Sequence, residues 1–127
     1  MKLLLDTRAL LWWLADDPRL GAGGRERIED AGNAVLVSDA SLWEIAIKVG
    51  IGKLRIDIGE ALAAIRERGL DTLRLEPPHL TTLAALERRH RDPFDHILIA
   101  QAIAEGATLM SNDARMRDYP VAVVGCG

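Results

Sequence analysis

Residues 91–113, RDPFDHILIAQAIAEGATLMSND, contain the pattern that decides the fold: a helix, then a strand, then an acid. The Asp-Pro pair near the start is typical of a helix N-terminus, because Asp accepts hydrogen bonds from free amides and proline fits the first helical position. The apolar run after it predicts a helix over residues 93–105. Residues 107–110 then predict a short buried strand, which leads directly to Asp113.

The rest of the chain repeats this alternation of helices and short apolar strands. Five strands are expected at residues 2–5, 34–37, 72–75, 107–110 and 121–124. Helices are expected at residues 7–16, 25–32, 39–49, 61–68, 77–89 and 93–105. Such alternation indicates a mostly parallel sheet that is covered by helices on both faces. Residues 1–127 therefore predict one α/β domain.

The composition is that of a globular protein of ordinary size. A chain of 127 residues suffices for one domain, and its 49% hydrophobic and 28% charged residues exclude a disordered polymer. No apolar run approaches the roughly 20 residues that span a bilayer, and the N-terminus lacks the features of a signal peptide. The single Cys126 has no internal disulfide partner, so we expect a cytoplasmic protein without membrane association.

The net charge of −3 does not by itself indicate nucleic-acid binding. The distribution of basic residues is more informative, because 13 of the 16 are Arg and residues 86–92 (LERRHRD) place several beside the acids of the opening stretch. Arg binds phosphate groups through two parallel hydrogen bonds. For any single Arg in this segment, however, a solvated helix end is the simpler interpretation.

Three acids occupy positions where open α/β sheets bind ligands. In such sheets the ligand site lies beyond the carboxyl ends of the strands, near the point where the strand order reverses. Asp6 directly follows the first strand, and Asp113 follows the fourth. Asp95 begins the helix that leads into that fourth strand. The three carboxylates can therefore meet in space.

Glu44 is a fourth candidate because of the helix that carries it. Residues 39–49 are apolar around most of the helix, and only the stripe Ser41–Glu44–Lys48 interrupts this surface. A charge in apolar surroundings is costly unless it is paired or binds a metal ion.

Each acid also has a purely structural interpretation. Asp6, Asp92 and Asp113 can cap helices, Asp95 lies in a first helical turn where acids are favoured, and Glu44 can pair with Lys48. For each acid taken singly, this is the simpler interpretation. Together, acids at strand exits, at a helix start and within an apolar helix predict a shared site.

Four segments resemble, in order and spacing, the motifs of PIN-domain proteins, and most closely those of VapC-type toxins of bacterial toxin–antitoxin pairs. They are LLLDTRALLWWL (3–14), VSDASLWEIAIKVGIGKL (37–54), RDPFDHILIAQA (91–102) and LMSND (109–113). The resemblance covers nearly the whole chain. It implies a three-layer α/β/α domain whose five-stranded parallel sheet has the strand order 3-2-1-4-5.

The resemblance also implies an acidic quartet, which falls on Asp6, Glu44, Asp95 and Asp113. For the third acid we choose Asp95 over Asp92, because the family places its acid directly before the run that here reads HILIAQA. Asp92 is then mainly a helix cap with a possible supporting role. Ser111 matches a hydroxyl position that can hold a water or a ligand carboxylate.

One residue departs from the family pattern. This subgroup usually has His after the Asp-Thr pair, whereas this chain has Arg8. Arg8 could contact a phosphate of the substrate, or it could pair with an acid of the quartet and weaken metal binding.

A cluster of carboxylates suits Mg²⁺ or Mn²⁺, since both ions prefer oxygen ligands. His79, His90, His96 and Cys126 lack the spacing of a zinc site. The expected reaction is metal-assisted hydrolysis of a phosphodiester, with Asp6 and Asp95 as direct ligands and with Glu44 and Asp113 acting through waters.

The family resemblance makes the substrate RNA, cut internally. It further implies a homodimer and a cognate antitoxin, bound through apolar surface of the helices at 7–16 and 61–68. Two alternatives come from other classes. A phosphate-accepting receiver domain needs an acidic pair after the first strand, where this chain has Asp6 alone. A catalytically silent PIN-fold binding module remains open, because Arg8 could occupy the metal site.

Overall fold

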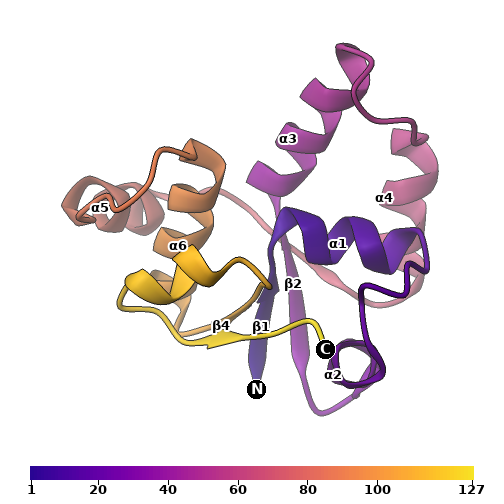
Figure 1. Ribbon diagram of the computed structural model, residues 1–127, viewed down its shortest axis with the longest axis horizontal. Helices are drawn as coiled ribbons and strands as arrows, with labels where there is room; N and C mark the ends of the chain where they lie inside the picture. The colour runs from indigo at the N-terminus through magenta and orange to yellow at the C-terminus, as the bar shows by residue number, and fades with distance from the viewer.

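The computed structural model describes all residues, 1–127, as a five-stranded sheet between two layers of helices (Figure 1). The strands are β1 (Lys2–Leu5), β2 (Ala34–Ser38), β3 (Asp71–Leu73), β4 (Thr108–Met110) and β5 (Val123–Val124). They lie in the order β3-β2-β1-β4-β5, and every neighbouring pair is parallel. The predicted architecture and strand order are confirmed.

Six α-helices and one 3₁₀ helix connect the strands. The helices are α1 (Thr7–Leu14), α2 (Ala22–Glu29), α3 (Asp39–Gly50), α4 (Ile58–Glu67), α5 (Pro77–Ala85), α6 (Pro93–Glu105) and the 3₁₀ helix η1 (Ala114–Asp118). None of them is long and apolar enough to cross a membrane.

Alternate side chains of each strand enter different cores, because successive residues of a strand point to opposite faces of the sheet. Leu3 and Leu5 of β1 pack with residues of α1, α2, α3 and α4 on one face. Leu4 packs on the other face with Leu98 and Ile99 of α6, and α5 packs against α6. Both faces of the sheet are buried, as parallel sheets require.

Helix α2 begins earlier than the sequence suggested. The helix expected at residues 25–32 spans Ala22–Glu29 and includes Gly23 and Gly24. A Cβ atom on Gly24 would overlap the carbonyl oxygen of Cys126, so only glycine allows the C-terminal backbone to lie this close. Cys126 is fully buried there, and burial raises the pKa of its thiol to about 11.

Helix α5 ends at Ala85, four residues before the predicted end at Arg89. Leu86 adopts an extended conformation and inserts its side chain into the core below α6, which stops the helix. Residues 86–92, which we call the arginine loop, therefore connect α5 to α6 as a loop. Its arginines, Arg88, Arg89 and Arg91, are all exposed.

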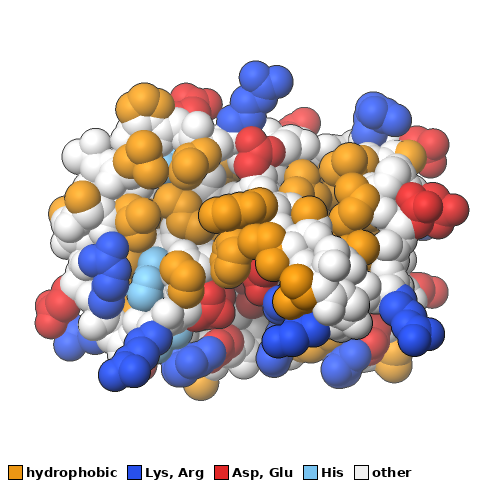
Figure 2. Space-filling model, turned by 90° about the horizontal axis from the view of Figure 1, so that it is seen from above, with side chains coloured by type: hydrophobic (Ala, Val, Ile, Leu, Met, Phe, Trp, Pro, Cys, Tyr) orange, Lys and Arg blue, Asp and Glu red, His pale blue; other side chains and the backbone are white.

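Helix α3 is less buried than its apolar sequence suggested. Trp43 and Ile47 are 64% and 39% exposed. The Trp43 ring meets Phe94 of α6 edge to face, with ring centroids 5.3 Å apart. The space-filling view from above shows apolar side chains gathered over much of this face (Figure 2). Some of the apolar side chains of α3 therefore lie on the protein surface and do not pack in the core.

Candidate active site

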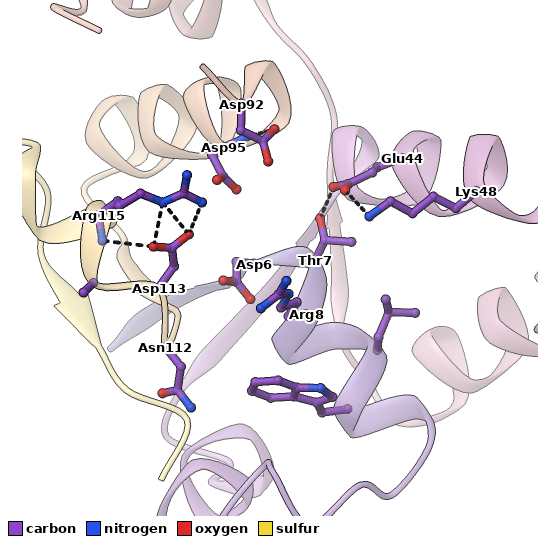
Figure 3. A pocket seen from close by; sticks show the side chains of 13 residues that line it. Asp6, Thr7, Arg8, Glu44, Lys48, Asp92, Asp95, Asn112, Asp113 and Arg115 are labelled. Atoms are coloured by element: carbon purple, nitrogen blue, oxygen red, sulfur yellow. Dashed lines mark hydrogen bonds and ion pairs between the residues drawn. The ribbon is translucent and has the colours of Figure 1, made fainter. Parts of the chain in front are cut away.

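The carboxyl ends of β1 and β4 lie side by side, with Leu5 in register with Met110. The next residue, Asp6, donates its backbone amide to the Met110 carbonyl over 3.0 Å. A pocket of about 440 Å³ opens here, and all four predicted acids line it (Figure 3). The other charged residues of its lining are Arg8, Lys48, Asp92 and Arg115.

Asp6 lies at the base of this pocket and is 6% exposed. Its Oδ1 accepts a 2.8 Å hydrogen bond from the amide of Ala9, so it also caps α1 as the structural interpretation expected. Burial raises the pKa of Asp6, although hydrogen bonds from Ser111 and Ala9 and the charge of Arg8 oppose the shift. No Lys or Arg forms an ion pair with this carboxylate.

Asp92 and Asp95 begin α6 but have different surroundings. Asp92 Oδ1 accepts hydrogen bonds from the amides of Phe94 (2.9 Å) and Asp95 (3.3 Å), which makes it the helix cap. The carboxylate of Asp95 is directed into the pocket (Figure 3). Burial raises the pKa of Asp95 to about 6 against a hydrogen bond from His90, and the negative charges of Asp92 and Asp6 add to the increase.

Glu44 reaches the pocket from α3 and is held at both oxygens. Its Oε2 lies 2.8 Å from Lys48 Nζ, which confirms the predicted pair. Its Oε1 accepts a 2.7 Å hydrogen bond from the hydroxyl of Thr7, which also lies 3.1 Å from the Ser41 hydroxyl. No sequence pattern indicated a role for Thr7. It directly follows Asp6 in the chain, but its hydrogen-bond partner, Glu44, lies on another helix.

Asp113 follows β4 and is held by the residue two positions ahead. The Arg115 guanidinium binds both carboxylate oxygens, with a shortest distance of 2.7 Å, and the Arg115 amide donates to Oδ1 over 3.0 Å. These bonds lower the pKa of Asp113 to about 2. Ser111 Oγ accepts the Asp113 amide over 3.0 Å, so Ser111 supports two acids of the pocket.

Arg8, the residue that departs from the family pattern, is exposed at the edge of the pocket. Its guanidinium forms no ion pair or hydrogen bond with any acid. Of the two roles considered for it, pairing with the quartet is therefore not observed, and its charge remains available to a ligand.

Two further residues near the site carried no recognisable signal in the sequence. His90 Nε2 lies 3.1 Å from Asp95 Oδ2, and His90 Nδ1 lies 2.9 Å from the hydroxyl of Tyr119. Tyr119 belongs to the segment after η1 and meets His90 only in the folded chain. His90 has no zinc-site spacing, and its contacts with Asp95 and Tyr119 form only in the folded chain.

The donor set fits a hard divalent cation. Five carboxylates and three cationic side chains line the pocket, so negative charge is in excess. Asp6 and Asp95 have raised pKa values and no Lys or Arg partner, whereas Glu44 and Asp113 are paired. In this arrangement no three acids, histidines or cysteines form a ready-made metal cluster. The pocket supplies oxygen ligands of the kind that Mg²⁺ and Mn²⁺ prefer.

A three-layer α/β/α sheet with an acidic pocket at the strand ends is characteristic of one class of domain. The PIN domain family profile matches residues 3–122, and the chain belongs to this family. Ribonuclease VapC22 of Mycobacterium tuberculosis is 28% identical over 120 residues, which cover 92% of this chain and 91% of VapC22.

Solved structures show the same fold at lower identity. A chain in the structure of VapBC2 from Rickettsia felis bound to a DNA fragment from its promoter has a TM-score of 0.78 and 18% identity, covering 98% of both chains. A chain of DNA-bound VapBC from Salmonella typhimurium has a TM-score of 0.71 and 17% identity, covering 100% of this chain and 99% of that one.

Proposed function

We propose that residues 1–127 form one PIN domain that acts as a metal-dependent endoribonuclease, the toxin of a toxin–antitoxin pair. The observation that carries this proposal is the meeting of Asp6, Glu44, Asp95 and Asp113 in one pocket, with Asp6 and Asp95 lacking a cationic partner. The similarity to Ribonuclease VapC22 supports the choice of RNA as substrate.

Asp6 and Asp95 are the proposed direct ligands of Mg²⁺ or Mn²⁺. The ion, when bound, supplies a water of lowered pKa and positive charge beside the phosphate. Glu44 and Asp113 act through waters, and one of them orients the attacking water or accepts its proton. Thr7, Lys48 and Arg115 hold these two carboxylates in place. No covalent protein nucleophile is needed.

Cationic side chains beside the pocket are the proposed contacts of the RNA strand. Arg8 is free at its edge, and the arginine loop lies next to it because His90 of that loop bonds to Asp95. A surface pocket of about 510 Å³ is lined by Arg88, Arg89, His90 and Arg91 of this loop and by Pro93 and His96 of α6. Phosphate oxygens fit such a surface.

The proposed protein partners are a second copy of the chain and a cognate antitoxin, as the likeness to VapBC structures suggests. Apolar side chains are available for both. Trp43, Ile47 and Leu62 are exposed, and a groove between α1 and α4 is lined by Leu11 and Leu14. Ile65, which lies on the same predicted helix as Leu62, is buried in the core and is not available for an interface. A monomer in sedimentation at micromolar concentration would contradict the homodimer.

The test is cleavage of an RNA panel by the wild-type protein and by Asp95→Asn. We expect chelator to abolish cleavage and Mg²⁺ or Mn²⁺ to restore it, with Ca²⁺ supporting it poorly because its coordination is looser. Asp95→Asn should be inactive. Cleavage that persists in excess chelator would exclude the mechanism. RNA binding without cleavage under any ion would instead establish the silent binding module.

A further inference from the structure

The hydroxyl of Tyr119 is surrounded by three polar groups of the arginine loop. Its oxygen lies 2.7 Å from the amide nitrogen of Arg89, 3.2 Å from that of His90, and 2.9 Å from Nδ1 of the His90 ring. Tyr119 is 5% exposed, so water does not complete these bonds. The Tyr119 hydroxyl therefore holds both the backbone of the arginine loop and the His90 side chain in place.

These three contacts determine the tautomer of His90. A phenol oxygen has two lone pairs and one hydrogen. The two amides can only donate, and they occupy both lone pairs of the Tyr119 oxygen. The phenol hydrogen must then point to Nδ1, which accepts it and carries no proton. The ring proton of His90 is thus on Nε2, the atom that lies 3.1 Å from Asp95 Oδ2.

We propose that Tyr119 and His90 are positioning residues for Asp95: Tyr119 fixes the tautomer of His90, and the neutral ring donates its Nε2 proton to Oδ2. The role rests on the proposed function, in which Asp95 binds the ion. A donor at Oδ2 fixes the rotation of the carboxylate and leaves Oδ1 free to bind a cation. Because the donor is neutral, it adds no positive charge that would compete with the ion.

The surroundings keep the His90 ring in this orientation. His96 Nε2 lies 2.7 Å from the backbone carbonyl oxygen of His90, and the two rings meet edge to face with centroids 5.1 Å apart. The Tyr119 ring packs against His90 in the same manner at 5.4 Å. The charged groups Asp92, Asp113 and Arg115 line the pocket nearby. Neither ring nitrogen of His90 needs a bond to any of them, since both already have partners.

Four variants separate this role from simple support of the loop. Tyr119→Phe removes the hydroxyl and keeps the ring. His90→Leu removes the donor to Asp95, and His90→Gln retains an amide donor of similar reach. Thr82→Val is the matched control, because it removes a hydroxyl that bonds only to the Pro78 carbonyl and does not line the pocket. Thermal melts in chelator establish that each variant is folded.

The first measurement is the tautomer itself, read from long-range ¹H–¹⁵N spectra of the metal-free protein at pH 7.5. The His90 signals, assigned by their loss in His90→Gln, should show a proton on Nε2 and a bare Nδ1. Tyr119→Phe should convert them to a mixture of tautomers, while Thr82→Val leaves them unchanged. A proton on Nδ1 of the wild-type ring would overturn the proposal, whatever the protein does with metal.

The second measurement is titration with Mn²⁺ by calorimetry. Loss of a group that orients a metal ligand typically weakens binding by about tenfold or more, and we expect this for Tyr119→Phe and His90→Leu. His90→Gln should remain within about threefold of wild type, and RNA cleavage by Tyr119→Phe should recover at high Mn²⁺. Wild-type affinity in folded Tyr119→Phe and His90→Leu would overturn the positioning role alone. Failure of the wild-type protein to bind Mn²⁺ or Mg²⁺ would overturn the proposed function and the positioning role together.

Discussion

Thr7 donates a 2.7 Å hydrogen bond to Glu44, which joins the first turn of α1 to the middle of α3 at the pocket. The Thr7 side chain is buried, and Glu44 has only 12% of its side chain exposed. The orientation of one proposed catalytic acid is thus set by a residue that itself has no charge.

Thr7→Val, which has nearly the same shape, should therefore reduce RNA cleavage. Glu44 would keep Lys48 but lose the bond that fixes Oε1, and the buried contact should cost about 1 kcal/mol in the free energy of unfolding. Thr7→Ser retains a hydroxyl and should keep most of the activity. Denaturant unfolding and cleavage rates measure the two effects. Equal activity in Thr7→Val and wild type would exclude an orienting role for Thr7.

Asp92 and Asp95 should respond differently to the same substitution. Asn caps a helix about as well as Asp, so Asp92→Asn should change stability by no more than roughly 0.5 kcal/mol and leave metal binding largely intact. Asp95→Asn removes an anionic ligand, so metal affinity and cleavage should collapse, while the metal-free fold keeps its stability or gains a little from relieved repulsion. Calorimetric titration and thermal melts in chelator compare them. If Asp92→Asn abolishes cleavage and Asp95→Asn does not, the third acid has been assigned to the wrong residue.

The raised pKa of Asp95 predicts how the stability of the metal-free protein depends on pH. A carboxyl whose pKa is about 6 in the folded state and 3.8 when unfolded binds its proton more tightly in the folded state. Its stabilising effect is complete below pH 3.8 and is lost as the pH rises through 6. Melts in chelator should therefore show a Tm about 3 °C higher at pH 5 than at pH 7.5, after allowance for solvent screening.

The Asp95→Asn variant provides the control for this pH dependence. Because Asn does not titrate, the rise in Tm between pH 7.5 and pH 5 should be clearly smaller in the variant. Acids with lowered pKa values, such as Asp113 at about 2, stabilise the folded protein in their ionised form. That stabilisation is lost only at lower pH. A rise of the same size in both proteins would assign the effect to another group.

The arginine loop should contribute to RNA binding and not to the chemical step. The double variant Arg88→Ala/Arg91→Ala removes two exposed charges that form no ion pair, so KM should rise while kcat is retained at saturating RNA. The salt dependence of binding should also become weaker, because fewer phosphates are neutralised. Arg66→Ala/Arg74→Ala, at exposed positions outside the pocket and the loop, is the matched control. If both double variants raise KM equally, the loop contributes only through the general positive charge of the surface.

Much of the fold followed from local patterns. The alternation of strands and helices predicted a parallel sheet, and the acid after each of two strands predicted where a pocket would lie. Both signals are local in sequence, because a strand exit and a helix cap each need only a few residues. The topology itself came from the family resemblance, since alternation alone leaves the strand order open.

The parts that could not be predicted depend on contacts between distant segments. The hydrogen bond from Thr7 to Glu44 joins two helices, and the bonds from Tyr119 to the arginine loop join two connections. The end of α5 is set by burial of Leu86, and the start of α2 by the chain end that lies against Gly24. Intrinsic helix propensity is a weak guide wherever tertiary packing decides.

The burial of Cys126 has a practical consequence for studying this protein. The thiol is fully enclosed and its pKa is about 11, so at neutral pH it is neither accessible nor ionised. A cysteine introduced on the surface, for example at the exposed Thr81 on α5, away from the apolar surface proposed for association, will then be the sole target of maleimide dyes or nitroxide spin labels. The distance between two such labels can reveal how copies of the chain associate without any mutation of the native cysteine.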